Sequence, residues 1–109
     1  MTENPVNNTV RMKRVTIIGD ENVSYRIMQE VLAFGASGYT NYIVHGKGTR
    51  GIRPRHAEPA NAKIEVIATP EIAHHILDHV AANYFEKYAM IAYLDDVEVL
   101  RGEKFGAKP

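Results

Sequence analysis

The chain has 109 residues, no cysteine, and a formal net charge of zero from thirteen basic and thirteen acidic side chains. This length allows one domain with one hydrophobic core, and the lack of cysteine excludes disulfides, thiolate nucleophiles and cysteine metal sites. Balanced charge argues against a general nucleic-acid coat protein. The polar head, residues 1–9, has no signal-peptide core, and no apolar run reaches membrane-spanning length, so we expect a disordered head and an intracellular protein.

The first half of the chain predicts a strand, a helix and a second strand. Residues 10–18 are rich in β-branched side chains, which favours a strand. Asp20 is placed to cap a helix that Gly35 ends. The apolar side chains of this helix recur at steps of four, four and three, so they share one face: Val23, Ile27, Val31 and Phe34. Residues 39–44 then predict the second strand.

The second half repeats this order. Residues 63–68 begin with charged and apolar side chains in alternation, which indicates a half-buried strand. Residues 69–71 combine a hydroxyl cap, a proline and an acid, which predicts a helix start. The apolar face of that helix is Ile72, Ile76 and Val80. Residues 88–94 predict a last strand with apolar side chains on both faces, followed by a short extended segment at 97–100 and a turn-rich tail from residue 101.

The order of these elements predicts an α+β fold, a ferredoxin-like βαββαβ arrangement with an antiparallel sheet. Two helices can cover only one face of such a sheet. The last strand is apolar on both faces, so the second face also needs a cover. We therefore expect another copy of the chain to supply it in a homo-oligomer.

A long basic loop, residues 46–60, joins the second and third strands. Four of the chain's thirteen cations lie within nine of its residues: Lys47, Arg50, Arg53 and Arg55. A cationic loop that contains glycines is suited to binding an anion, and phosphate is the first candidate. The alternative is a solvated loop that binds no ligand. A P-loop is excluded, because Asn41 stands where that motif needs glycine and Gly48 where it needs a hydroxyl.

Histidines are the other candidates for chemistry. His75 and His79 have the spacing of a two-histidine metal site, but no glutamate follows the first, and we expect both to face solvent without a metal. His45 and His56 flank the basic loop and could assist anion binding. No arrangement of serine, histidine and acid stands out, so the sequence predicts no catalytic residue.

Four stretches together resemble the PII-like signalling proteins, in particular the carbon-regulatory branch of SbtB and the carboxysome-associated PII-like proteins. They are Gly35–Thr40, Gly46–Arg50, Tyr84–Ala89 and Glu98–Gly106, in order and with similar spacing. The resemblance implies a trimer of ferredoxin-like subunits, with residues 46–60 as a flexible T-loop. It also implies adenine nucleotides in the clefts between subunits, and a signalling task linked to inorganic carbon through bicarbonate uptake or carboxysome function.

The resemblance also assigns residues. Those matching the loop base near the nucleotide phosphates are Lys47, Gly48, Thr49, Arg50 and Arg53. Arg101 matches a C-terminal arginine that reaches phosphate across the subunit boundary. Residues 83–88 contain no glycine where nitrogen-sensing relatives have a glycine-lysine B-loop, so the nucleotide expected is ADP or AMP rather than ATP. The tail, residues 101–109, lacks the cysteine pair of some SbtB proteins, which excludes redox switching there.

These observations predict a single PII-like domain over residues 1–109: a non-enzymatic, cytoplasmic sensor of ADP or AMP with bicarbonate as a co-effector. Its partners would be two further copies of itself and a bicarbonate transporter or carboxysome-related protein, without nucleic acid or membrane insertion. Two alternatives remain at this stage. One is a ferredoxin-like RNA-binding module, and the other is a small enzyme acting on a phosphorylated metabolite with His45 or His56 as acid-base.

Overall fold

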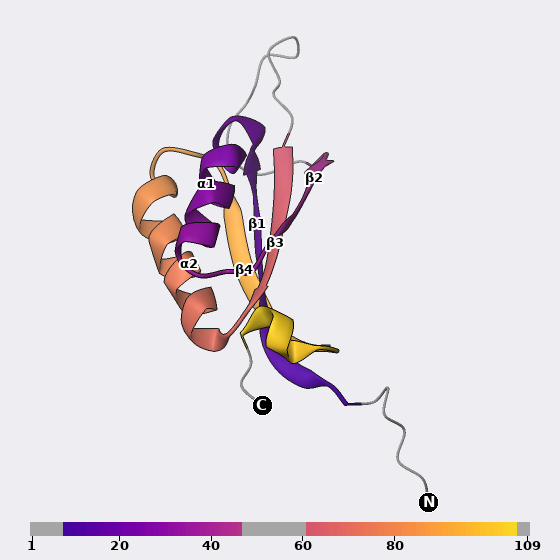
Figure 1. The fold of residues 1–109 in the computed structure, drawn as a ribbon. Helices are drawn as coiled ribbons and strands as arrows, with labels where there is room; N and C mark the ends of the chain where they lie inside the picture. Colours follow the sequence, from indigo (N-terminus) through magenta and orange to yellow (C-terminus); the bar gives the residue numbers. More distant parts are fainter. Residues whose placement is uncertain (1–7, 47–60, 107–109) are drawn as a thin grey trace, which may run out of the picture.

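The computed structural model describes residues 8–46 and 61–106, which form a four-stranded antiparallel sheet with both helices on one face (Figure 1). The elements in chain order are β1 (Val10–Asp20), α1 (Glu21–Ala33), β2 (Thr40–Val44), β3 (Asn61–Ala68), α2 (Pro70–Tyr84), β4 (Ile91–Val99) and the short 3₁₀ helix η3 (Gly102–Phe105). The strand order is β2-β3-β1-β4, with every neighbouring pair antiparallel. This confirms the predicted α+β ferredoxin-like fold.

Local chemistry sets the ends of both helices as predicted. The Asp20 side chain accepts a hydrogen bond from the Asn22 backbone N–H at 2.8 Å and so caps α1. Gly35 follows α1 with φ at +107°, a conformation that glycine adopts without a steric cost. At α2, Thr69 is the cap residue and Pro70 opens the helix.

The hydrophobic core lies between the sheet and the two helices. Alternate side chains in the middle of β1 and β3 face the helices and are buried: Val15, Ile17, Ile64 and Val66. The helices contribute Val23, Ile27, Val31, Ile76 and Val80 as their periodicity predicts, together with Ala73. The predicted Phe34 and Ile72 are only partly buried and pack against this core. Removing this apolar surface from water is the main driving force for folding.

The last strand differs from the prediction. Instead of a strand over 88–94 and a separate extended segment, β4 runs without a break from Ile91 to Val99. Two acids in its middle are compatible with a strand because β1 places a cation opposite each of them. Asp95 accepts from Arg14 at 2.8 and 3.2 Å, and the Lys13 ammonium lies 2.6 Å from Asp96. Opposite charges paired across two strands stabilise their register.

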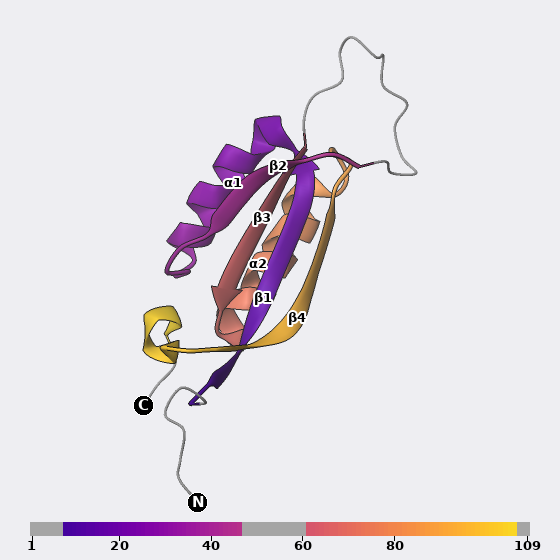
Figure 2. The ribbon, with the colours of Figure 1, turned by 90° about the vertical axis from the view of Figure 1, so that its right-hand side faces the viewer.

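No helix within the described residues packs on the second face of the sheet, and Figure 2 views the molecule from that side. Ile91 and Tyr93 of β4 point away from the helices and are 56% and 46% exposed. Met90 and Leu94 have the opposite orientation and pack against the core. The apolar character of β4 on both faces is therefore confirmed. Neither α1 nor α2 is long and apolar enough to cross a membrane.

Candidate functional site

Most of the predicted anion-binding residues lie outside the described part of the chain. These are Lys47, Gly48, Thr49, Arg50 and Arg53, together with His56 from the same loop. The structure does place the two ends of the loop. His45 and Gly46 follow the end of β2, and Asn61 begins β3, paired with Val44. We call this junction of β2 and β3 the loop root.

Two further turns of the chain reach the loop root. Asn61 is also paired with Asp20, the cap of α1, so the β1–α1 turn lies beside it. The connector between α2 and β4, residues 85–90, packs on the same turn. A methyl group added at Gly19 would come within 2.7 Å of the Met90 Cβ, so this contact requires glycine at position 19. The loop root therefore lies at one end of the sheet, next to the connector.

A polar trio on the second face of the sheet adjoins the loop root. The Tyr42 hydroxyl of β2 donates to Glu65 of β3 at 3.1 Å, and the Lys63 ammonium lies 3.7 Å from the same carboxylate. The Tyr42 hydroxyl raises the pKa of Lys63, and Glu65 acts in the same direction, so Lys63 stays cationic. In the sequence, Lys63 and Glu65 indicate only the polar half of an alternating strand. Their position directly after a basic loop was the signal that could have identified them.

Arg101 lies just beyond the end of β4. Its backbone has φ at +59° and ψ at +51°, a left-handed conformation that costs a non-glycine residue about 1 kcal/mol. The residues after it form η3, a short helix where the sequence predicted only turns, and Gly106 closes it with φ at +93°. The left-handed backbone fixes where the exposed Arg101 side chain leaves the chain. Among the predicted site residues, this is the one that the structure describes.

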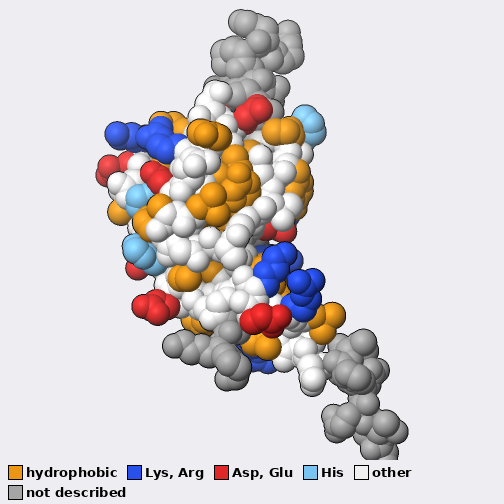
Figure 3. Space-filling model, in the orientation of Figure 1, with side chains coloured by type: hydrophobic (Ala, Val, Ile, Leu, Met, Phe, Trp, Pro, Cys, Tyr) orange, Lys and Arg blue, Asp and Glu red, His pale blue; other side chains and the backbone are white. Residues whose placement is uncertain are grey.

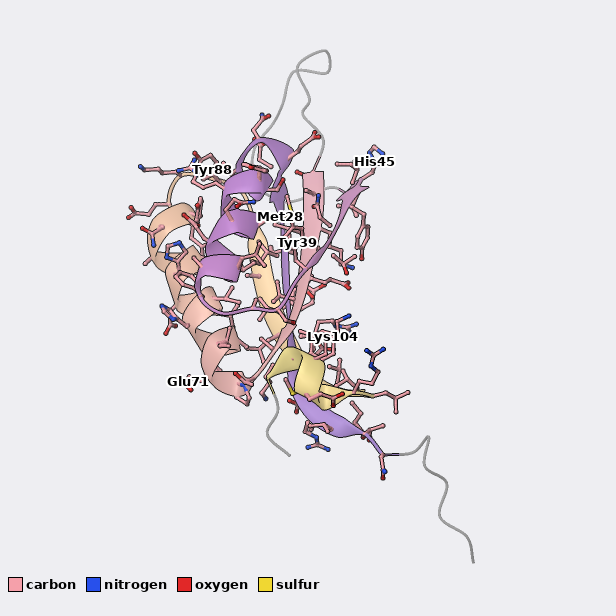
Figure 4. All side chains as sticks on the ribbon, in the orientation of Figure 1. Met28, Tyr39, His45, Glu71, Tyr88 and Lys104 are labelled. Atoms are coloured by element: carbon pink, nitrogen blue, oxygen red, sulfur yellow. The ribbon has the colours of Figure 1, made fainter. Side chains whose placement is uncertain are left out.

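Arg101 and the loop root lie at opposite ends of the sheet. Ile91 pairs with Ile18 near the loop root, whereas Val99 pairs with Val10 at the far end. From Ile91 to Arg101 the chain runs roughly 30 Å at the usual strand rise. In Figure 4, His45 and Tyr88 are at the upper end and Lys104, next to Arg101, is at the lower end. One copy of the chain therefore cannot bring Arg101 and the loop root to one small ligand.

Charged side chains also gather at the Arg101 end. Figure 3 shows basic and acidic groups side by side near η3. Arg11, Lys13 and Arg14 of β1 are register partners of Glu98, Asp96 and Asp95 of β4. Because Lys13 and Arg14 already form ion pairs with Asp96 and Asp95, these two cations are poorly placed to hold a phosphate. Arg101 belongs to none of these pairs.

The sequence predicted that His75 and His79 both face solvent, and the structure contradicts this prediction for His79. His79 Nε2 lies 2.9 Å from a carboxylate oxygen of Glu30 in α1, and its side chain is 25% exposed. His75 is exposed but stacks on the Phe34 ring at 4.3 Å. The prediction failed at His79 because α1 packs against that side of α2. Within residues 8–46 and 61–106, no three potential metal ligands come together.

One hollow on the described surface lies away from the loop root. It is an open depression of about 620 Å³ where α2 begins, lined by residues that include Phe34, Ile72, His74 and Asp78. None of these residues belongs to the loop root or to the tail. The hollow is therefore not the predicted anion site, whose two parts lie at the ends of the sheet.

Comparisons with solved structures show the same fold in regulatory proteins. A PII-like signalling protein from Thermus thermophilus is 41% identical, with a TM-score of 0.78 over 89% of this chain and 97% of that one. CPII from Thiomonas intermedia, solved with ADP, AMP and acetate, is 21% identical, with a TM-score of 0.79 over 90% and 97% of the two chains. The same protein solved with ADP and bicarbonate is 23% identical, with a TM-score of 0.78 over the same shares.

A family model gives the assignment directly. The model described as nitrogen regulatory protein P-II matches residues 12–104, which extend from β1 into η3. The resemblance inferred from four short stretches is therefore a match along most of the chain. The chain belongs to the nitrogen regulatory protein P-II family.

Proposed function

We propose that this chain is a PII-like sensor that binds ADP or AMP in the clefts between the subunits of a homotrimer. The observation that carries this proposal is the separation of the loop root from Arg101. A site that uses both must take them from two copies of the chain. The structures of CPII with ADP and AMP support the choice of ligand.

The proposed site has two parts. One subunit supplies the cations and small residues of its loop for the phosphates: Lys47, Gly48, Thr49, Arg50 and Arg53. A neighbouring subunit supplies Arg101. A guanidinium forms strong paired hydrogen bonds with phosphate oxygens, and its charge is fixed at every physiological pH. Lys63, at the loop root, is a further cation within the same part of the fold.

Binding would act through the loop. Phosphate charge draws the loop cations together, and the ordered loop then shows or hides a surface that a target protein recognises. In this proposal the chain regulates and does not catalyse. Its site is in the cytoplasm, and its target is a bicarbonate transporter or a carboxysome-related protein, so that the signal controls inorganic-carbon uptake or carboxysome-linked metabolism.

Bicarbonate is the proposed co-effector. The loop carries more cations than one diphosphate needs, and an arginine fork presents paired donors to a carboxylate-shaped anion. Two anions repel, so joint binding is favourable only where the first ligand orders the loop and spares the second that entropic cost. The structure of CPII with ADP and bicarbonate supports the pairing. By linkage, each ligand then tightens the other by the same factor.

Calorimetry tests the proposal. The full chain is titrated with AMP, ADP, ATP, cyclic AMP and a short RNA, with and without bicarbonate at fixed pH and ionic strength. We expect binding of ADP or AMP, tightened by bicarbonate, and three subunits by light scattering. Binding of RNA alone would favour the RNA-binding module, and turnover of the bound nucleotide would favour an enzyme. If the ADP affinity is the same with and without bicarbonate, the link to inorganic carbon must depend on a partner protein.

A further inference from the structure

A polar cluster joins α1 to the last turn of α2, and none of its residues belongs to the proposed ligand site. One carboxylate oxygen of Glu30 accepts from Tyr84 Oη at 2.7 Å and lies 2.9 Å from His79 Nε2. Asn83 Nδ2 lies 3.1 Å from His79 Nδ1 and donates to the His79 carbonyl oxygen at 2.9 Å. The Phe34 ring meets the His79 ring edge to face at 4.8 Å. The cluster therefore encloses the imidazole on several sides.

The partners define one protonation state of His79. The Glu30 carboxylate can only accept, so Nε2 must carry a hydrogen. The Asn83 amide nitrogen can only donate, so Nδ1 must be the bare, accepting nitrogen. These two requirements describe a neutral imidazole with its hydrogen on Nε2. In that form both ring nitrogens and both Asn83 amide hydrogens have partners.

Protonation disturbs one side of this arrangement and not the other. A second hydrogen on Nδ1 would point at the Asn83 amide nitrogen, so two donors would face each other at 3.1 Å. Turning the Asn83 amide over would present its oxygen to Nδ1. The same turn would set that oxygen against the His79 carbonyl oxygen and so break the 2.9 Å bond. The bond between His79 and Glu30 survives, because an imidazolium still donates from Nε2.

We propose that His79 is a proton-sensitive latch on the last turn of α2. Neutral His79 holds Asn83, and protonation releases Asn83 while His79 stays bound to Glu30. Other charged or titratable groups near the ring, among the described residues, are Tyr84, Arg26 at 5.6 Å over the Tyr84 ring, and His75, which stacks on Phe34. Histidine is the side chain suited to this role, because its charge changes between about pH 5 and pH 8.

The released turn leads directly into the connector of residues 85–90. The backbone N–H groups of Lys87 and Tyr88 both donate to the Tyr84 carbonyl oxygen, at 3.1 and 3.0 Å, and the Tyr84 and Tyr88 rings lie 6.0 Å apart. Loosening at Asn83 therefore reaches the segment that packs beside the loop root. The latch does not require a nucleotide, so it can be tested whether or not the ligand proposal is correct.

The test is NMR on the isotopically labelled full chain without ligand, at about pH 8 and about pH 5.5, either side of the histidine titration. At the higher pH we expect the His79 tautomer with hydrogen on Nε2. On acidification, hydrogen exchange at the Asn83 side chain and the Lys87 and Tyr88 amides should rise about fivefold after correction for intrinsic rates, the factor for one hydrogen bond. The His79→Gln variant should lose this rise.

His74→Gln is the matched control, because His74 is an exposed histidine on the same helix; it should keep the rise. Asn83→Ala should exchange rapidly at both pH values, which gives a second reading if His79→Gln fails to fold. A neutral tautomer with hydrogen on Nδ1 would overturn the proposal. So would an unchanged exchange rate in the unmodified chain, or an equal acid response in Asn83→Ala or His79→Gln.

Discussion

The two faces of the sheet contrast sharply. The face under the helices is apolar, and Val15 and Val66 in its centre are 0% exposed. The other face mixes exposed Ile91 and Tyr93 with paired charges, yet Thr16 in its middle is only 1% exposed. The helices account for burial on the first face, whereas no helix of residues 8–46 or 61–106 covers the second, and Thr16 is buried there within the chain itself. One face therefore stabilises the subunit, and the other is suited to contact between subunits.

The largest expected effect comes from the covered face. Ile76 of α2 is 0% exposed, and replacing it with alanine leaves a cavity in the core. Ile76→Ala should lower the free energy of unfolding by about 2 to 5 kcal/mol, measured by denaturant titration. Leu32→Ala is the control, because Leu32 lies on α1 and is 40% exposed. Similar losses in the two variants would contradict the assignment of the core.

The second face is tested by Ile91→Asp. A buried charge without a partner is unfavourable, so this variant should dissociate the proposed trimer and leave a folded subunit. Light scattering and circular dichroism report the two properties separately. Tyr25→Asp should leave the assembly intact, because Tyr25 lies on α1 and is 68% exposed. A well-folded trimer from Ile91→Asp would show that this face makes no subunit contact.

Arg101 tests whether the far end of the sheet belongs to the ligand site. Arg101→Gly removes the guanidinium and suits the left-handed backbone, so stability should not fall. Affinity for ADP should drop by about 1.5 to 3 kcal/mol, the value of a hydrogen bond to a charged group. Lys104→Ala in η3 is the control. Equal ADP affinity in the unmodified chain and Arg101→Gly would remove Arg101 from the site.

Loop cations should behave in the same way. Arg50→Ala and Lys47→Ala should each weaken ADP binding by about 1.5 to 3 kcal/mol, which calorimetry measures. Both residues are charged and lie outside the described residues, and we expect the melting temperature to stay constant. Unchanged ADP affinity in both variants would show that these loop cations are not part of the nucleotide site.

The smallest effect concerns Tyr84, a buried polar residue at the end of α2. Burial, with the hydrogen bond to Glu30, raises the pKa of Tyr84 to about 12. The folded state therefore favours the neutral phenol, and the stability it contributes is present below about pH 10 and lost as pH rises towards 12. Tyr84→Phe should cost about 1 kcal/mol at neutral pH and reduce the alkaline loss. Thermal melts compare it with Tyr25→Phe, which should change neither.

Much of the fold was accessible from the sequence because its signals are local. Asp20, Gly35 and the run from Thr69 to Glu71 place helix ends through contacts within a few residues. The long last strand was not accessible in this way. Asp95 and Asp96 read as a break in an apolar run, and only their pairing with β1 makes them strand residues.

The same distinction between local and long-range relations applies to the candidate site. The chain's own sequence determined the basic composition of the loop, the family resemblance and the order of elements, since each depends on neighbouring residues. The tertiary structure decided that Lys63 and Glu65 meet Tyr42, that His79 turns to Glu30, and that Arg101 lies far from the loop root. These relations join residues distant in sequence, so strand register and helix packing fix them and no local pattern can.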